Sequence, residues 1–238
     1  MSDSGFKVHA MQLGPMENFV YLVEDIASRR CAVVDPAWEV DKIVSRAAQL
    51  DLRITDILLT HSHNDHINGI EGLLNHASAE VHLLKPEYEF WDHELDKPSL
   101  HHGGDELRLG GTSITMLHTP GHTPGSACYQ LGNEIITGDT LFVFGCGRCD
   151  MKGGSPEDMF ATLKQMKERL PEDMLIHPGH NYSVKPTATF GEQIDGNPFL
   201  HYDDCDSFVN FRMHVHDKMR DEPYALLNKQ QLKIANLL

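Results

Sequence analysis

The sequence predicts an α/β protein with four layers, in which two sheets pack face to face and helices cover their outer faces. Two observations lead to this expectation. Residues 6–35 hold three short apolar runs separated by polar or Gly/Pro residues, which is typical of antiparallel strands. The chain then alternates between helical and strand-like spacing, and a second group of strand-like runs follows before another helix.

In the first half of the chain, helices and strands are predicted to alternate after the opening strands. From Trp38 to Leu50 the apolar residues recur at helical spacing, and residues 53–60 have the pattern of a buried strand. Further along, we predict three segments: a helix over 67–76, a strand over 79–84, and a helix or a long loop over 85–104. The last segment is a candidate wall of a functional site.

The second half is expected to contain a second meander. Its strand-like runs cover residues 105–109, 112–118, 126–131 and 133–139. Ser155, followed by Pro156 and two acidic residues, has the pattern of a helix N-terminus. Residues 174–180 are expected to form a strand that ends in a turn. We expect a single domain over residues 1–238, with a short, mainly helical C-terminal segment from about residue 185.

Composition limits the partners of this chain. Its net charge of -15 repels phosphate backbones and no Lys/Arg-rich run is present, so no nucleic-acid partner is expected. The apolar runs are far shorter than the roughly 18 residues of a membrane span, and the first residues lack a basic and apolar leader. The 5 cysteines, an odd number, favour a reducing compartment. We expect a cytoplasmic protein that binds a small molecule and no membrane.

The segment "THSHNDH", residues 60–66, directly follows a predicted strand and is a candidate metal site. His61, His63, Asp65 and His66 supply imidazole and carboxylate groups, which bind borderline cations such as zinc. One loop could serve two ions, with the first two residues on one ion and the last two on the other. The simpler alternative is a polar loop in a chain that contains 16 histidines.

Four ligands cannot complete two metal shells, so a metal site requires donors from later strand ends. The sequence supplies His122, Asp139 and His180, each at or after the end of a strand-like run. His118 and His177 lie inside such runs, and we expect both to have structural roles.

These motifs carry a family resemblance. His61-x-His63-x-Asp65-His66, "TPGHTPGS", "GDTLF" and "PGHNYS" occur in the order seen in the metallo-β-lactamase superfamily, and the resemblance covers most of the chain. Within it, "TLFVFGCGR" and "PTATFGEQIDGNPFL" are most similar to the glyoxalase II (hydroxyacylglutathione hydrolase) branch. The resemblance implies an αββα sandwich with the site at its edge, in agreement with the four predicted layers.

The resemblance also implies a ligand set for two divalent ions. It places His61, His63 and His122 on one ion, Asp65, His66 and His180 on the other, and Asp139 between them. Zinc is the first expectation, with iron and manganese as alternatives, because the same donors accept all three.

The implied activity is hydrolysis of a small thioester, such as an acylglutathione, through a metal-bound hydroxide. Asp65 is the candidate catalytic residue because it could orient the attacking water and hold its proton. A thiolate leaves readily, so a thioester requires no strong general acid. By resemblance, Arg148 would contact a carboxylate of the glutathione moiety and Tyr182 its backbone.

Two other activities share this donor set. The residues "GCGRCD" resemble those of the persulfide dioxygenases, which would hold one iron through His61, His122 and Asp139 and act on glutathione persulfide. A phosphodiesterase or nuclease is the further alternative, although the acidic charge opposes it. The segment "CDMKGG" departs from the glyoxalase II pattern, and the C-terminal segment shows no clear match to the basic residues that complete the glutathione site there. We interpret Cys146 as part of the "GCG" turn, with no redox role for the Cys146 and Cys149 pair.

Overall fold

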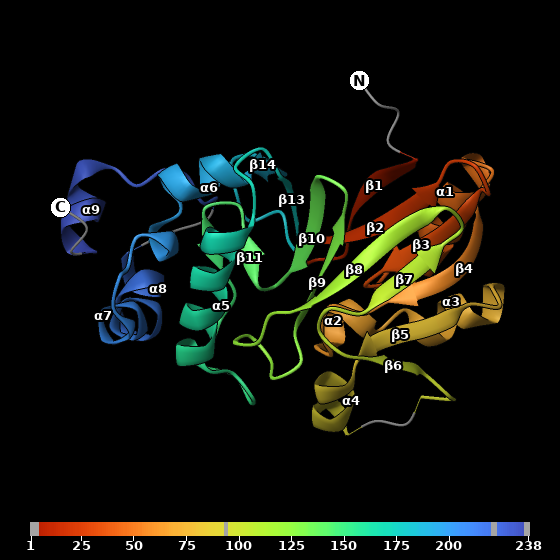
Figure 1. Cartoon of the computed structure of the whole chain (residues 1–238), viewed down its shortest axis with the longest axis horizontal. Coiled ribbons are helices and arrows are strands. Elements are labelled where there is room, and N and C mark those ends of the chain that lie inside the picture. The colour runs from red at the N-terminus through yellow and green to blue at the C-terminus, as the bar shows by residue number, and fades with distance from the viewer. Residues whose placement is uncertain (1–4, 93–94, 220–222, 236–238) are drawn as a thin grey trace.

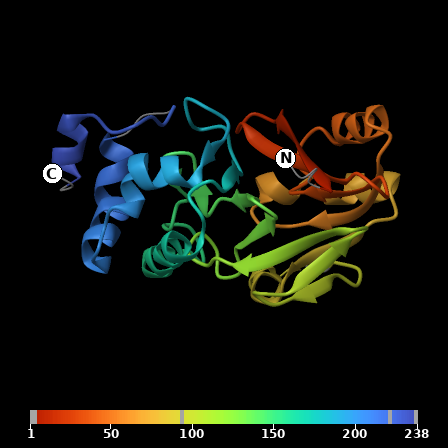
Figure 2. The same cartoon turned by 45° about the horizontal axis from the view of Figure 1, so that its top comes forward.

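Two six-stranded sheets pack face to face in the computed structural model, which describes residues 5–92, 95–219 and 223–235. The first four residues, which bear on the expectation of no leader, lie outside this part. Figures 1 and 2 show the two sheets in the middle of the molecule, helices α1 and α3 at one end and helices α7 to α9 at the other. The predicted αββα sandwich is confirmed.

The first sheet has the strand order β1-β2-β3-β4-β5-β6. Its first three strands pair antiparallel, as the opening meander predicts, and β3 to β6 pair in parallel. The strands are β1 (Phe6–Leu13), β2 (Asn18–Asp25), β3 (Arg30–Val34), β4 (Arg53–Leu58), β5 (Glu80–Leu84) and β6 (Ser99–His101).

The second sheet has the strand order β14-β13-β10-β9-β8-β7. Its neighbours pair antiparallel except for β10 and β13, which are parallel. The strands are β7 (Glu106–Leu109), β8 (Thr112–His118), β9 (Ala127–Leu131), β10 (Glu134–Gly138), β13 (Leu175–Pro178) and β14 (Ala188–Thr189). A separate hairpin consists of β11 (Leu141–Phe142) and β12 (Gly145–Cys146).

The helices lie on the outer faces and at the C-terminal end. In the first half they are α1 (Val40–Gln49), α2 (Asn64–Ile67), α3 (Ile70–His76) and α4 (Lys85–Trp91). Helix α5 (Pro156–Arg169) packs on the second sheet. The remaining segments are α6 (Phe190–Gly196), the 3₁₀-helix η1 (Pro198–Leu200), α7 (Cys205–Asn210), the π-helix η2 (Phe211–Val215), α8 (His216–Met219) and α9 (Lys229–Ile234). In the part that the structure describes, no helix has the length and apolarity of a membrane span.

Two predicted segments differ from the structure. The helix expected over 67–76 is divided into α2 and α3, because the N–H of Gly69 donates to the Pro36 carbonyl rather than to a helical one. The segment 85–104 contains helix α4 and also the short strand β6, which the pattern did not predict. The predicted start of α5 is confirmed, since Ser155 Oγ accepts from the Asp158 N–H at 3.1 Å.

Apolar residues on both faces of the central strands form the core. All eight residues of β2 are buried: Phe19, Tyr21 and Val23 pack between the sheets, whereas Val20 and Leu22 pack under α1 and α3. Successive side chains of a strand point to opposite faces, so the middle of a strand covered on both sides is apolar, whereas its ends can hold buried polar residues such as Asn18, Glu24 and Asp25. This explains why β2 shows no alternation of apolar and polar residues.

Hydrogen bonds join the two sheets where the candidate ligands emerge. Tyr129 Oη, on β9, donates to the Leu59 carbonyl just beyond β4 at 2.6 Å. Tyr21 Oη, on β2, donates to the Pro178 carbonyl at the end of β13, also at 2.6 Å. These bonds fix the ends of β4 and β13 relative to the opposite sheet.

Candidate metal centre

All seven predicted donors converge at one edge of the sandwich. They come from the loop after β4, from α2, from the loop between β8 and β9, and from the residues after β10 and β13: His61, His63, Asp65, His66, His122, Asp139 and His180. Strand ends bring together residues far apart in sequence, as the motif spacing predicts.

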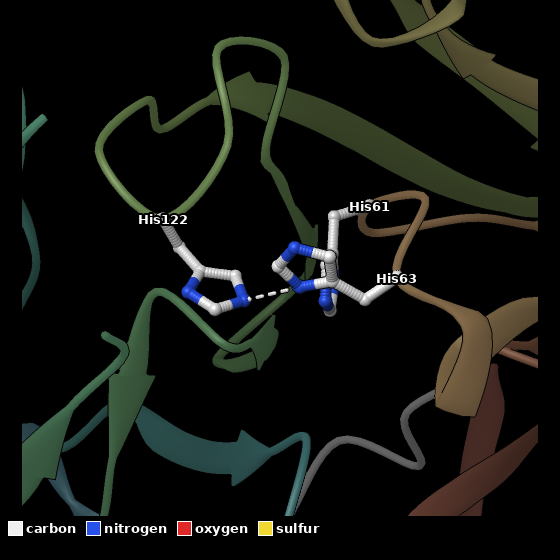
Figure 3. A group of neighbouring side chains, drawn as sticks. All are labelled: His61, His63 and His122. Carbon is white, nitrogen blue, oxygen red and sulfur yellow. Dashed lines mark hydrogen bonds between the residues drawn. The ribbon is translucent and has the colours of Figure 1, made fainter. Parts of the chain in front are cut away.

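One group of donors consists of His61, His63 and His122, whose ligand atoms lie within 4.8 Å of one another. His122 Nε2 is 2.8 Å from His63 Nδ1, and the His61 ring lies beside both (Figure 3). His61 Nε2 is buried and has no hydrogen-bond partner. A buried nitrogen without a hydrogen-bond partner is costly unless a ligand such as a metal ion meets it.

A second group consists of Asp65, His66 and His180. The Nε2 atoms of the two histidines are 3.1 Å apart, and Asp65 Oδ2 is 3.4 Å from each. Asp139 lies between the groups, with Oδ1 3.3 Å from His66 Nε2 and Oδ2 3.6 Å from His122 Nε2. One carboxylate therefore faces histidines of both groups.

The second nitrogens of three histidines determine where the lone pairs point. His122 Nδ1 lies 2.7 Å from the Arg148 carbonyl, and His180 Nδ1 lies 2.8 Å from the Met16 carbonyl. His66 Nδ1 is 3.0 Å from an oxygen of Asp35. Since these oxygens accept, each Nδ1 carries a proton, and the Nε2 atom of each ring is the one that can bind a metal ion once it is deprotonated.

These Nε2 atoms fit a metal ion. Those of His66 and His180 lie 3.1 Å apart beside Asp65 and Asp139, so without metal a proton on His66 relieves their repulsion, and a divalent ion could take the place of that proton. Imidazole nitrogens with carboxylate oxygens are the donors that zinc and iron bind. The residues present thus match divalent ions in both chemistry and orientation.

Protonation in this pocket follows burial and charge. Burial lowers the pKa of His122 to about 4, although Asp139 opposes the shift. Burial would raise the pKa of the Asp139 carboxyl, but His180 and His66 hold it well below its usual value. Burial likewise opposes a charge on His66, yet Asp139 and Asp35 raise its pKa to about 9. Before metal binds at neutral pH, His122 is therefore a free base and Asp139 is ionised, whereas His66 carries a proton that a bound metal ion would displace.

Asp35 is a supporting residue that the motifs did not reveal. It follows β3, is buried, and accepts from Thr60 N at 2.7 Å and from Thr60 Oγ1 at 2.6 Å, in addition to its contact with His66. Thr60 Oγ1 is in turn 3.0 Å from His61 Nδ1. One carboxylate thus orients histidines of both groups. Its position after a strand of the first sheet was the available signal.

Asn18 and Glu87 are two further supporting residues. Asn18 Nδ2 donates to Asp65 Oδ2 at 2.9 Å, while its Oδ1 accepts from Trp38 Nε1 at 2.8 Å. Glu87, buried on α4, accepts from Ser62 N at 2.7 Å and from Gly125 N at 3.0 Å. It therefore joins the loop of His61 and His63 to the loop of His122. The segment expected to form a site wall supplies this residue.

His118 and His177 lie outside both donor groups. His118 Nε2 is 2.9 Å from the Pro124 carbonyl, and His177 Nε2 is 2.7 Å from a Glu134 oxygen. The structure thus separates them from the seven donors, as their positions within strands predict.

A family model described as the metallo-beta-lactamase superfamily matches residues 13–180, a span that includes all seven donors. The chain belongs to the metallo-beta-lactamase superfamily.

Two relatives show how far this kinship extends along the chain. It is 33% identical to the probable polyketide biosynthesis zinc-dependent hydrolase BaeB of Bacillus velezensis, over 91% of this chain and 97% of BaeB. It is 36% identical to the hydroxyacylglutathione hydrolase of Aeromonas hydrophila, over 71% of this chain but only 63% of that enzyme. The likeness to BaeB therefore spans nearly both chains, and the likeness to the second relative does not.

Solved structures of the superfamily agree with this fold. ETHE1 from Myxococcus xanthus superposes with a TM-score of 0.80 at 26% identity, covering 98% of this chain and 100% of that chain. TTHA1623, solved in a di-iron-bound form, superposes with a TM-score of 0.69 at 31% identity, covering 81% of this chain and 100% of that chain. The helical C-terminal part thus falls within the span matched by ETHE1.

In this member of the superfamily a cavity of about 660 Å³ opens beside the donors. Its wall includes Arg148 and Tyr182, and the Tyr182 ring stacks on the His180 ring at 4.5 Å. The C-terminal segment contributes residues that sequence reasoning did not single out, namely Arg212, Asp217 and Tyr224. Both predicted substrate contacts therefore lie at the cavity, together with a second arginine.

Proposed function

We propose that this chain is a metal-dependent hydrolase that cleaves a small thioester. The observation that carries the proposal is the convergence of two donor groups beside an open cavity, whose wall includes His63, Asp65, His122, Asp139 and His180. Because these donors line an open cavity and not a closed shell, a water molecule and a substrate could reach ions held there, as hydrolysis requires and a purely structural metal site does not.

Two ions account for the arrangement. One would be held by His61, His63 and His122, the other by Asp65, His66 and His180, with Asp139 as the shared ligand. Bound divalent ions would lower the pKa of a water molecule and polarise the substrate carbonyl. Zinc is the proposed ion because BaeB is named a zinc-dependent hydrolase, and the di-iron form of TTHA1623 makes iron the alternative.

Asp65 has the geometry of a positioning and proton-holding residue. Asn18 fixes its Oδ2 from one side at 2.9 Å, and the carboxylate lies on the cavity wall. From there it can accept a hydrogen bond from the attacking water and hold the proton until the leaving group departs. Asn18 prevents the carboxylate from turning away during that transfer.

A thioester suits the rest of the cavity. Beyond the donors, the described wall offers arginine, tyrosine and apolar side chains, and its one further carboxylate, Asp217, pairs with Arg212. A thiolate, whose reference pKa is about 8.5, needs no strong acid to depart, whereas an amine does. Kinship with a hydroxyacylglutathione hydrolase supports the same substrate class.

The test is a metal count combined with a substrate panel on the purified protein. We expect two metal ions per chain, hydrolysis of a small thioester, and loss of activity with a chelator that zinc restores. Asp65→Asn should lower kcat about a hundredfold or more, whereas His118→Gln, a change at a histidine outside both donor groups, should not.

The panel also separates the alternatives. A single tightly held iron with oxygen uptake on glutathione persulfide would replace the hydrolase with a dioxygenase. Cleavage of a phosphodiester faster than any thioester would instead indicate a phosphodiesterase.

A further inference from the structure

Two arginines in the cavity wall are each paired with a carboxylate of the same chain. Arg148 donates to Asp150 through Nε at 2.9 Å and Nη2 at 2.7 Å, the two parallel bonds of a fork. Arg212 donates from Nη2 to both oxygens of Asp217, at 2.8 and 2.9 Å. The positive charge available for a substrate carboxylate is therefore balanced within the chain at both positions.

The pair of Arg148 and Asp150 is a surface ion pair, with side chains 61% and 42% exposed, that is held by two aligned bonds and a short tether. The hydrogen bond from Arg148 lowers the pKa of Asp150 to about 2, so the carboxylate stays charged at any working pH. Because Asp150 is tethered two residues away, its effective concentration at the guanidinium is high. An incoming carboxylate must displace it or bind a guanidinium whose charge is already compensated.

Arg212 offers no better anchor. Only 3% of this residue is exposed, its Nη1 lies 3.0 Å from His216 Nδ1, and its Nε is buried without a hydrogen-bond partner. With Nη2 occupied by Asp217, no open fork remains for a ligand carboxylate.

We propose that Asp150 is a specificity-determining residue, which occupies Arg148 and so makes the cavity select thioesters whose thiol portion carries no carboxylate. Asp217 has the same effect at Arg212. The inference rests on the proposed thioester hydrolysis and names its substrate class: an acyl group on an uncharged thiol.

Other features of the wall fit an uncharged thiol. Met16 and Met151 are large apolar side chains that remain 45% and 42% exposed, and both line the cavity along with Phe142. Exposed apolar groups at a cavity favour alkyl or amide-bearing ligands over charged ones. Asp150 also lies in "CDMKGG", the segment that departs from the glyoxalase II pattern.

A binding experiment tests the selection without relying on catalysis. The probes are S-methylglutathione and its dimethyl ester, which differ only in two carboxylates, titrated calorimetrically into zinc-loaded protein. Wild type should bind the ester at least as tightly as the acid. Asp150→Asn should strengthen binding of the acid about three- to tenfold, the strength of an exposed but well-aligned ion pair, and leave the ester nearly unchanged.

Two controls isolate the effect of Arg148. Asp195→Asn makes the same charge change at an exposed position and should not alter the ratio of the two affinities. Adding Arg148→Gln to Asp150→Asn should abolish the gain. Wild type that binds the acid more tightly than the ester, that fails to bind the ester, or whose ratio of affinities is insensitive to Asp150→Asn would overturn the proposal.

A kinetic experiment distinguishes this proposal from the proposed function. With acetyl-N-acetylcysteamine and S-acetylglutathione as substrates, Asp150→Asn should lower KM for the second alone. If neither thioester is hydrolysed while the binding ratio shifts as expected, thioester hydrolysis fails and the selectivity stands. If both are hydrolysed and the ratio does not shift, only the selectivity fails.

Discussion

Among the described residues, two separate clusters bring three or more histidine and carboxylate ligand atoms together, and one of them has the polar arrangement of a metal centre. The first is the seven-donor centre at the strand ends. The second lies on the parallel strands β4, β5 and β6 and contains Asp56, His82 and His101. In both clusters potential ligand atoms lie within 4.8 Å of one another. In the second cluster these atoms belong to Asp56, Glu80 and His82. Distance alone does not distinguish them.

Hydrogen-bond partners do distinguish the two clusters. His82 Nε2 is 3.2 Å from Asp56 Oδ1, and His101 Nε2 is 3.0 Å from His82 Nδ1, so each contact joins one donor to one acceptor. Arg30 supplies the opposite charge to Asp56 at 3.0 Å. At the strand-end centre, by contrast, His61 Nε2 is buried without a hydrogen-bond partner and the Nε2 atoms of His66 and His180 converge on two carboxylates. We propose that a cation completes the first cluster, whereas hydrogen bonds within the chain already complete the second.

The largest expected effect comes from Asp139→Asn, which removes the charge between the two donor groups. Loss of one shared anionic ligand should lower kcat/KM about a thousandfold, because bound ions contribute several kcal/mol to catalysis. Activity assays with metal analysis would measure this. The same change at Asp56 should alter activity less than about threefold, and equal losses at the two positions would remove the distinction between the clusters.

Asp56→Asn should instead destabilise the fold. Only 4% of the Asp56 side chain is exposed, and its loss leaves Arg30 without its counter-charge. We expect the free energy of unfolding to fall by about 2 to 3 kcal/mol, as for other buried pairs that lose one partner. Urea unfolding of metal-free protein measures the change. An unaltered unfolding midpoint would show that the second cluster contributes nothing to stability.

Asp35→Asn tests the seven-donor centre through a residue that contacts a donor, His66, but is not itself one of the seven. The neutral amide lacks the negative charge that the Asp35 carboxylate presents to His66 Nδ1 and to Thr60 Oγ1. Its hydrogen bonds to both groups should weaken, and metal affinity should fall about ten- to a hundredfold. Competition with a chromophoric chelator would report this affinity. A variant that retained wild-type affinity would mean that Asp35 has only a structural role.

The smallest expected effect is the pH dependence of the Asp56 contribution. Burial alone would raise the pKa of this carboxyl, but hydrogen bonds from His82, Thr55 and Arg30 hold it below 3.8. A group whose pKa is lower in the folded state stabilises the fold above its unfolded pKa, and this stability is lost as pH falls through the folded value. The difference in unfolding free energy between wild type and Asp56→Asn should therefore be constant from pH 5 to 7 and shrink below about pH 4. A difference that did not change with pH would contradict this assignment.

Sequence patterns predicted most elements near the centre because those elements have strong local signals. The meander over 6–35 and the cap at Ser155 are local features, and both occur as predicted. The division between α2 and α3 did not follow from the pattern, since it depends on a contact of Gly69 with Pro36 in another loop. The pairing of Arg148 with Asp150 was also missed, although the two residues are neighbours in sequence. A carboxylate two residues away can pair or point elsewhere, and only the turn geometry decides.

By itself the sequence determined which side chains gather at the strand ends, because donors placed directly after strands meet at one edge of a sandwich. Tertiary structure alone decided which nitrogen of each histidine carries the proton. His180 is oriented by the carbonyl of Met16, 164 residues away, and His66 by Asp35. Those partners are a backbone carbonyl and a common acidic residue, which no motif marks. Their positions follow from the packing of the two sheets. That packing therefore orients the histidine rings so that their Nε2 atoms converge.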